Sequence, residues 1–206
     1  MPTKKTIYII RHGETDYNKK GIIQGSGIDS NLNDTGRKQA DQFYKAYHHI
    51  PFDKIYTSEL KRTQQSVEQF TKNSIPMQVL SELNEINWGK FEGLKGSPDS
   101  FKEYKAMTED WKSGLLDRAV EEGETPNALQ RRQKVGLDKI INQKEETTIL
   151  IAMHGRAMRS FLCLLTQTPL QRMDKFKHNN LCLYVVEYDG NTFKIAEQNC
   201  SKHLWI

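Results

Sequence analysis

Two of the six histidines follow short apolar runs and are themselves followed by glycine, in Ile10-Arg11-His12-Gly13 and Ala152-Met153-His154-Gly155. Ligands of open α/β sheets bind outside the carboxyl ends of the strands. Two such strand ends would therefore bring two imidazoles and at least one guanidinium to one edge of a sheet. A glycine after each histidine would let backbone N–H groups approach an anion closely. The pattern predicts an anion site at that edge.

The other four histidines lack this setting. His48 and His49 are typical of a solvated helix end, and His178 and His203 of ordinary core or surface histidines. We expect no role for them at the site. Taken alone, Arg62 would equally be a solvated helix arginine.

Apolar, β-branched runs alternate along the chain with stretches of helical spacing. Strands are expected at 7–10, 54–57, 76–80 and 147–153, with a terminal hairpin of 181–188 and 192–197. Helices are expected after the N-cap residues Asp34 and Ser58, and over 126–142 and 156–167. This alternation predicts an α/β fold with three α/β/α layers, in which helices cover both faces of a mostly parallel central sheet.

The stretch from about 94 to 123 interrupts this alternation. An apolar and aromatic face recurs there at helical spacing, formed by Phe101, Tyr104, Trp111 and Leu115. This face could cover a ligand or pack against the core. We expect a helical insertion rather than a second domain, because 206 residues suit one large domain, 1–206.

Composition excludes several classes of protein. The formal charge is +4 with no long run of one sign, whereas a nucleic-acid binder concentrates its basic residues in a stripe. No segment approaches the ~18 apolar residues of a membrane span, and the first apolar run is too short for a signal peptide. Three cysteines without a CxxC pair favour a reducing compartment. We expect a cytoplasmic protein that binds neither nucleic acid nor membrane.

The chain resembles the histidine phosphatase superfamily, the phosphoglycerate mutase-like proteins. Arg11-His12-Gly13-Glu14-Thr15 with Asn18 resembles the signature of that family. Further segments resemble its motifs in order: Gln24-Gly25 with Asp29, Leu32 and Gly36; Ser58, Leu60, Arg62 and Ser66; Leu83, Glu85, Gly89, Glu92 and Gly93; Gly123-Glu124-Thr125 with Arg132; and His154-Gly155 with Arg159. The matches extend from residue 7 to about 160, and their order makes the resemblance highly specific.

The resemblance implies a metal-independent phosphomonoesterase that needs no cofactor and forms a phosphohistidine at His12. A transferred phosphoryl group carries charge on three oxygens, so its catalysis is mostly positioning and charge stabilisation. Arg11 and Arg62 would supply planar guanidinium forks for these oxygens, and His154 a further donor. Glu85 would protonate the leaving group and then activate water.

The same resemblance implies that Asn18, Gln24 and Gly25 line the phosphate and substrate entrance, and that Gly155, beside the second histidine, also contacts the substrate. The substrate would be a small phosphorylated metabolite. A homodimer is compatible with the sequence. Arg156 stands where many relatives carry glycine or asparagine, so it would add a cation near the phosphate or at the pocket rim, or it would point outward.

Two alternatives stay open. A cofactor-dependent phosphoglycerate mutase would return the phosphoryl group to a substrate, but such mutases usually have a longer insertion with paired arginines. Here the insertion has an isolated Arg118, and the Arg131-Arg132 pair falls in the later helix. A non-catalytic phosphate-binding module would be expected to lose His12 or Glu85, and both are present.

Overall fold

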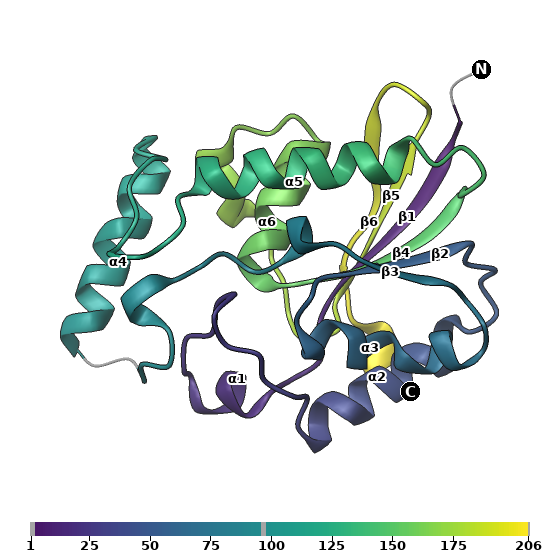
Figure 1. The fold of residues 1–206 in the computed structure, drawn as a ribbon, viewed down its shortest axis with the longest axis horizontal. Coiled ribbons are helices and arrows are strands. Elements are labelled where there is room, and N and C mark those ends of the chain that lie inside the picture. The colour runs from purple at the N-terminus through teal and green to yellow at the C-terminus, as the bar shows by residue number, and fades with distance from the viewer. Residues whose placement is uncertain (1–2, 96–97, 206) are drawn as a thin grey trace.

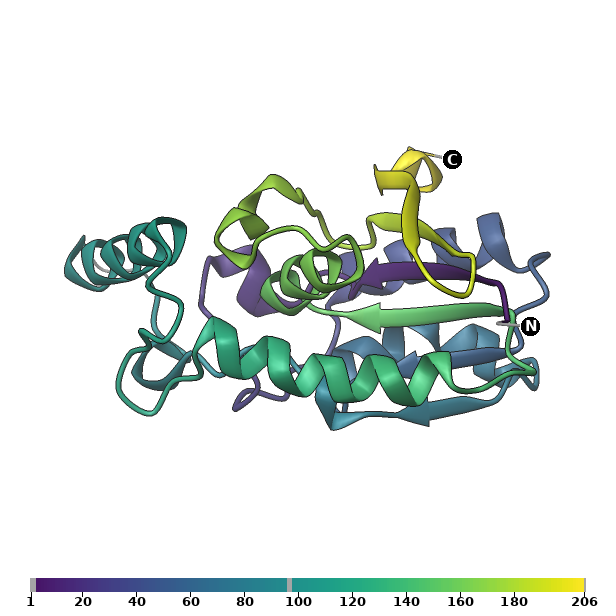
Figure 2. The ribbon, with the colours of Figure 1, turned by 90° about the horizontal axis from the view of Figure 1, so that it is seen from above.

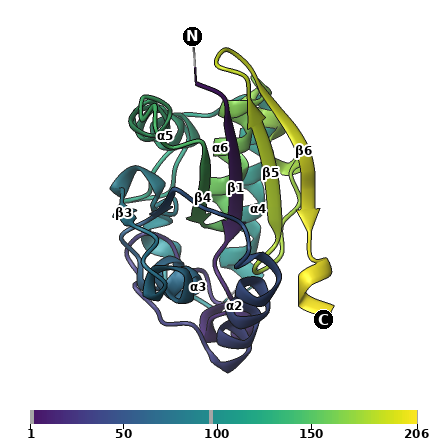
Figure 3. The ribbon, with the colours of Figure 1, turned by 90° about the vertical axis from the view of Figure 1, so that its right-hand side faces the viewer.

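The computed structural model describes residues 3–95 and 98–205, and its centre is one six-stranded sheet of order β3-β2-β4-β1-β5-β6. The strands are β1 (Lys5–Arg11), β2 (Lys54–Thr57), β3 (Met77–Val79), β4 (Thr148–Met153), β5 (Leu183–Tyr188) and β6 (Phe193–Cys200). The pairs β3–β2, β2–β4 and β4–β1 are parallel, whereas β1–β5 and β5–β6 are antiparallel. Figure 3 shows β3 and β6 at opposite edges of the sheet.

Helices cover both faces of this sheet. The helices are α1 (Asp16–Lys20), α2 (Asp34–Tyr47), α3 (Lys61–Lys72), α4 (Pro98–Ser113), α5 (Pro126–Ile141) and α6 (Gly155–Leu165). In Figure 1, α5 and α6 lie above the sheet and α2 and α3 below it. The predicted three-layer α/β/α architecture is confirmed. Within the described ranges, no helix is both long and apolar enough to cross a membrane.

The central strands are buried on both faces, and this burial fixes their register. Ile7 and Ile9 of β1 belong to the core cluster that includes side chains of α5 and α6. Ile10 and Leu150 belong to a second cluster, which includes side chains of α2 and α3. Each fully buried aliphatic side chain stabilises the fold by about 1.5–3 kcal/mol. A shift of register by one residue would turn these side chains to the wrong layer.

Both predicted N-caps are wrong. The cap of α2 is Asn33, whose Oδ1 accepts from the Gly36 N–H at 2.8 Å, and Asp34 is the first helical residue. Helix α3 begins only at Lys61, with Leu60 in the N-cap position. The Ser58 hydroxyl accepts from the Leu60 N–H at 3.1 Å instead, so it holds the turn before the helix.

The predicted helical insertion corresponds to α4, which stands beyond one end of α5 and away from the sheet (Figure 2). The side chain of Phe101 lies outside the described residues. Tyr104 and Trp111 turn inward against Trp88, with ring centroids 5.3 and 5.7 Å from it. Leu115 is 58% exposed. Two members of the aromatic face therefore pack against the core.

A close backbone contact joins the start of α2 to the loop after β1. A Cβ added to Gly36 would lie 2.1 Å from the Glu14 carbonyl oxygen and 2.8 Å from its nitrogen. Neither atom belongs to a flexible side chain, so Gly36→Ala should reduce the free energy of unfolding by about 1–3 kcal/mol. The exposed neighbour substitution Thr35→Ala should stay within about 0.5 kcal/mol of the wild type. Urea denaturation measures both, and equal stability of the two variants would contradict the contact.

Candidate active site

The parallel pairing of β1 with β4 brings the two predicted histidines together. The paired residues end at Arg11 opposite Met153, so His12 and His154 leave the sheet side by side. Their ring centroids are 5.2 Å apart, and both side chains are buried. The predicted convergence of two strand ends is therefore present.

His12 is held as a neutral imidazole with one free nitrogen. Its Nδ1 lies 2.7 Å from the carbonyl oxygen of Gly13, which can only accept, so Nδ1 carries the proton. The lone pair is then on Nε2. Burial, together with the charges of Arg62 and Arg11, lowers the pKa of His12 well below its usual value of 6.5. Near neutral pH the ring therefore presents an uncharged Nε2 that can act as a nucleophile.

Arg62, on the first turn of α3, is fully buried beside these rings. Its Nε donates to Nδ1 of His154 at 3.2 Å, and its two terminal nitrogens donate to the carbonyls of Ile28 at 2.7 Å and Gly25 at 3.1 Å. Burial lowers the pKa of Arg62 to about 10, so the guanidinium stays charged near neutral pH. One further hydrogen remains on each terminal nitrogen, enough for the paired contact expected with a phosphoryl group.

His154 uses both ring nitrogens within the protein. Because Nδ1 accepts from Arg62, the proton is on Nε2, which donates to the Ser58 hydroxyl at 2.8 Å. Burial and the neighbouring Arg62 lower the pKa of His154 well below 6.5. In this arrangement the ring orients Arg62. To donate to an anion, the role predicted from the sequence, the ring would have to exchange its hydrogen bond with Ser58 for one with the anion.

Glu85 lies against the N-terminus of α6, directly after His154. Its Oε1 accepts from the backbone N–H of Ile86 at 2.9 Å and of Ala157 at 2.8 Å. Its Oε2 accepts from the backbone N–H of Arg156 at 3.1 Å. Glu85 is 7% exposed, and its carboxyl group occupies the positive end of the helix dipole. This position brings Glu85 to the same edge of the sheet as the histidines.

Arg132 of α5 fixes the backbone that carries Glu85. Its Nε and one terminal nitrogen bind the two carboxylate oxygens of Glu124 at 2.7 and 2.9 Å. The same side chain donates to the carbonyls of Glu82 at 2.9 Å and Glu85 at 3.0 Å. The matched segments around residues 85 and 124 therefore act together, through an arginine that need not touch a substrate.

Two predicted entrance residues bond mainly to their own loop. Gln24 is buried, and its amide donates to the Thr15 hydroxyl at 2.7 Å and accepts from Ser30 at 2.6 Å. The Asn18 carbonyl oxygen accepts from the Thr15 N–H at 3.2 Å and from Asn180 at 3.1 Å. These contacts shape the loop after β1.

The predicted glycines serve close packing of one segment on another. The Gly13 N–H, expected to approach an anion, donates to the Ser66 hydroxyl at 2.9 Å and is already bonded within the protein. A Cβ on Gly25 would lie 2.5 Å from the Ile86 carbonyl oxygen, and one on Gly155 would lie 2.9 Å from Cε1 of His178. Side chains at these positions would push apart the segments that form the site.

Arg156 does not point outward, which was one of the orientations that the sequence left open. It is buried and points into the contact with the insertion, where it donates to Asp174 at 2.8 Å and to the Tyr104 hydroxyl at 3.1 Å. Its guanidinium carbon also lies 5.7 and 5.5 Å from the ring centroids of Trp88 and Trp111. Its charge therefore attaches α4 to the start of α6, and Asp174 balances it.

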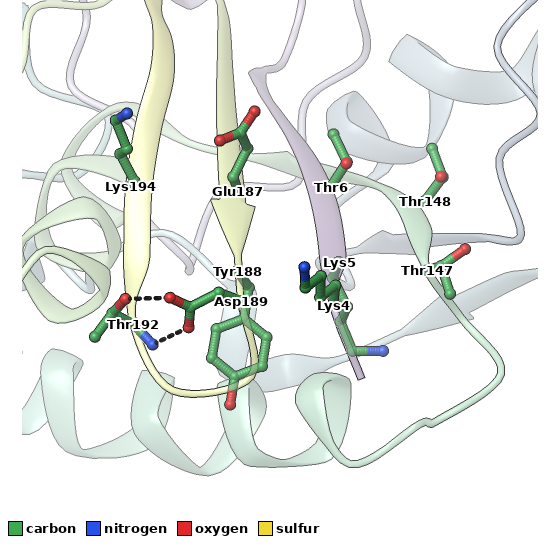
Figure 4. A pocket seen from close by; sticks show the side chains of 10 residues that line it. All are labelled: Lys4, Lys5, Thr6, Thr147, Thr148, Glu187, Tyr188, Asp189, Thr192 and Lys194. Carbon is green, nitrogen blue, oxygen red and sulfur yellow. Dashed lines mark hydrogen bonds between the residues drawn. The ribbon is translucent and has the colours of Figure 1, made fainter. Parts of the chain in front are cut away.

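A cavity of ≈ 540 Å³ lies at the opposite end of β1 and β4, under the β5–β6 hairpin. It is lined by Lys4, Lys5, Thr6, Thr147, Thr148, Glu187, Tyr188, Asp189, Thr192 and Lys194 (Figure 4). Several of its polar groups bond within the protein: Asp189 accepts from Thr192, and Lys5 donates to backbone carbonyls. None of the predicted site residues lines this cavity.

Over residues 7–201 the sequence matches the histidine phosphatase superfamily (branch 1), and the chain belongs to this superfamily. The predicted resemblance is thus confirmed. The protein is a phosphoric monoester hydrolase of the phosphoglycerate mutase family.

Individual relatives are similar to this chain over most of their length. The adenosylcobalamin/alpha-ribazole phosphatase of Escherichia coli is 25% identical over 186 residues, which cover 88% of this chain and 89% of the relative. The "Probable phosphoglycerate mutase GpmB" of Shigella dysenteriae is 28% identical over 188 residues, covering 88% and 84%. The solved structure of YhfR from Bacillus stearothermophilus is 27% identical, with a TM-score of 0.85 over 97% of this chain and 99% of that one.

Sequence reasoning missed His178, whose Nδ1 lies 3.3 Å from a terminal nitrogen of Arg11. It lies in a loop and follows no strand, so the pattern that singled out His12 could not find it. The strand topology is the signal that could have found this residue. Because β5 runs antiparallel to β1, with Leu183 opposite Ile10, residues just before β5 lie beside the end of β1.

The site histidines should make stability depend on pH. The pKa values of His12 and His154 are well below 6.5, and that of His178 is lowered by burial and Arg11 to about 3. Below pH 6.5 the unfolded chain takes up these protons first, so the free energy of unfolding should fall with decreasing pH. The slope is up to about 1.4 kcal/mol per pH unit for each histidine.

Urea denaturation between pH 7.5 and 5 measures this slope. His178→Gln should reduce it, because one buried neutral imidazole is removed. His49→Gln, at an exposed position, should leave the slope close to that of the wild type. Stability that stayed constant from pH 7 to pH 5 would show that the folded protein protonates these rings normally.

Proposed function

We propose that the protein is a metal-independent phosphomonoesterase that hydrolyses a small phosphorylated metabolite through a phosphohistidine at His12. The observation that carries this proposal is the neutral His12 ring, whose Nε2 lone pair is free and whose pKa is lowered first by burial and then by Arg62 and Arg11. Such a site combines an uncharged nucleophile with fixed positive charge for the phosphoryl oxygens.

In the first step Nε2 of His12 attacks phosphorus while the bond from phosphorus to the ester oxygen breaks. Arg11 and Arg62 stabilise the charge on the transferred phosphoryl group, and Glu85 gives its proton to the leaving alkoxide. In the second step Glu85 accepts a proton from water, whose oxygen attacks the phosphohistidine. Inorganic phosphate leaves, and His12 is regenerated with its proton on Nδ1.

The hydrogen bonds of Glu85 indicate which oxygen carries the proton. Oε1 accepts from two backbone N–H groups and Oε2 from one. A carboxylate oxygen that accepts a single N–H keeps a lone pair for a proton. We therefore assign proton transfer to Oε2.

Positive charge from protein side chains would stabilise the negative charge of the phosphoryl group, as a metal ion does in other phosphatases. Arg11 and Arg62 provide two permanently charged groups at the end of β1 and the start of α3. The relative from Escherichia coli is named a phosphatase of adenosylcobalamin and alpha-ribazole, which supports a phosphorylated small molecule as the class of substrate.

Phosphoglycerate mutase is the alternative, which the name of the Shigella dysenteriae relative favours. A mutase would need cations to hold the carboxylate of its substrate. Arg118 of the insertion forms an ion pair with Asp110, and Arg132 is bound to Glu124. With these cations paired internally, phosphoryl transfer to water is the preferred outcome.

A trapped phosphoenzyme tests the nucleophile. Labelled substrate quenched during turnover in excess EDTA should give an acid-labile, base-stable phosphoenzyme, since phosphohistidine has these properties. His12→Ala should abolish the label, whereas His49→Ala should retain it. Label that persisted in His12→Ala, or turnover that required added divalent metal, would overturn the mechanism.

Leaving groups of different basicity test Glu85. An alkyl phosphate releases a basic alkoxide that needs a proton, whereas an activated aryl phosphate releases a stable phenolate. In single turnover, Glu85→Gln should slow phosphoenzyme formation from the alkyl ester about 10²- to 10⁴-fold and from the aryl ester much less. Exposed Glu145→Gln is the control. Equal slowing of both esters would exclude Glu85 as the leaving-group acid.

A further inference from the structure

His178 lies in the loop between the 3₁₀ segment Leu170–Lys175 and β5, beside Arg11 at the end of β1. Its Nδ1 is 3.3 Å from a terminal nitrogen of Arg11. The loop is tied to the same place by the backbone, because the Leu181 N–H donates to the Arg11 carbonyl at 3.1 Å. The contact between His178 and Arg11 is therefore built into the strand pairing.

The direction of this hydrogen bond fixes the state of the ring. A guanidinium only donates, so Nδ1 of His178 accepts and the proton is on Nε2. Burial, followed by the charges of Arg11, Arg159 and Arg156, lowers the pKa of His178 to about 3. Asp174, which lies among the same arginines, is bound to Arg156 and Arg159. His178 is thus uncharged throughout the usual working range of pH.

The ring also packs against the start of α6. A Cβ on Gly155 would lie 2.9 Å from Cε1 and 3.1 Å from Nε2 of His178, and 3.6 Å from Nε of Arg11. His178 therefore occupies the space beside Gly155 and contacts Arg11 from that side. The Nε–H of Arg11 is buried and has no hydrogen-bond partner among the described residues.

We propose that His178 is a positioning residue that holds the Arg11 guanidinium by one terminal N–H and leaves its Nε–H for an oxygen of a phosphoryl group. This inference rests on the proposed function. This positioning role requires that the hydrogen-bond acceptor at residue 178 be uncharged. A carboxylate at this position would neutralise Arg11 and compete with the bound anion, whereas an imidazole orients the cation and keeps its charge for the ligand.

Direct binding of orthovanadate, measured by calorimetry without turnover, tests this role. His178→Leu removes the acceptor at similar volume and should weaken binding about 5- to 10-fold, the scale of one typical protein hydrogen bond. His178→Glu should weaken binding at least as much, since it pairs with Arg11. His178→Gln keeps an acceptor and should remain within about threefold of the wild type, by the same hydrogen-bond scale. His49→Leu is the exposed control.

The Gln and Glu variants are nearly isosteric. Comparing them therefore tests the role of an uncharged acceptor even if His178→Leu fails to fold. Equal affinity of these two variants, or a Gln variant as weak as a folded Leu variant, would overturn the role of an uncharged acceptor. The ratio of wild-type to Gln affinity should also stay constant between pH 6 and 8. A ratio that changed with a midpoint in that range would show that His178 titrates there.

The outcomes separate this inference from the proposed function. Orthovanadate binding that depends on residue 178 in a protein without phosphatase turnover would refute the proposed function alone. Full turnover with binding indifferent to residue 178 would refute the positioning role alone. Absence of orthovanadate binding by the wild type would refute both.

Discussion

The guanidinium of Arg62 lies wholly inside the protein, and a cation can remain there only if its surroundings satisfy it. Its partners are the carbonyls of Gly25 and Ile28 and the ring of His154. These contacts join α3, the loop after β1 and the end of β4. Burial of one charge therefore requires three distant segments of the chain to meet, and their meeting point is the candidate active site.

Arg62, together with Arg11, also determines the protonation state of the two imidazoles. Burial together with Arg11 and Arg62 holds the pKa values of both His12 and His154 far below their usual value. Neutral rings have a lone pair, and whether it is free depends on neighbours. The Gly13 carbonyl leaves one nitrogen of His12 available, whereas Ser58 and Arg62 occupy both nitrogens of His154. Two histidines in matching sequence settings thus differ chemically: His12 has a free ring nitrogen, and His154 has none.

The sequence was sufficient to predict the layers, the position of each strand and the meeting of His12 with His154, because apolar periodicity and strand ends are local properties. It could not predict which polar groups are already bonded. Gln24 was expected at the entrance, yet it bonds within its own loop. The Gly13 N–H was expected to approach an anion, and Arg156 was a candidate cation for the phosphate, yet their partners come from distant segments. His178 was missed for the same reason, since only the antiparallel pairing of β5 with β1 brings it to Arg11.

Arg156 links two parts of the molecule through different atoms of one residue. Its backbone N–H binds Glu85, and its side chain binds Tyr104 of α4 and Asp174. The insertion is therefore not a freely exchangeable module, even though it stands apart from the sheet. An insertion grafted from a relative with glycine or asparagine at this position would bring no partner for the guanidinium, and the buried cation would disturb the helix start that holds Glu85. Changes in residue 156 and in the insertion should thus be inherited together.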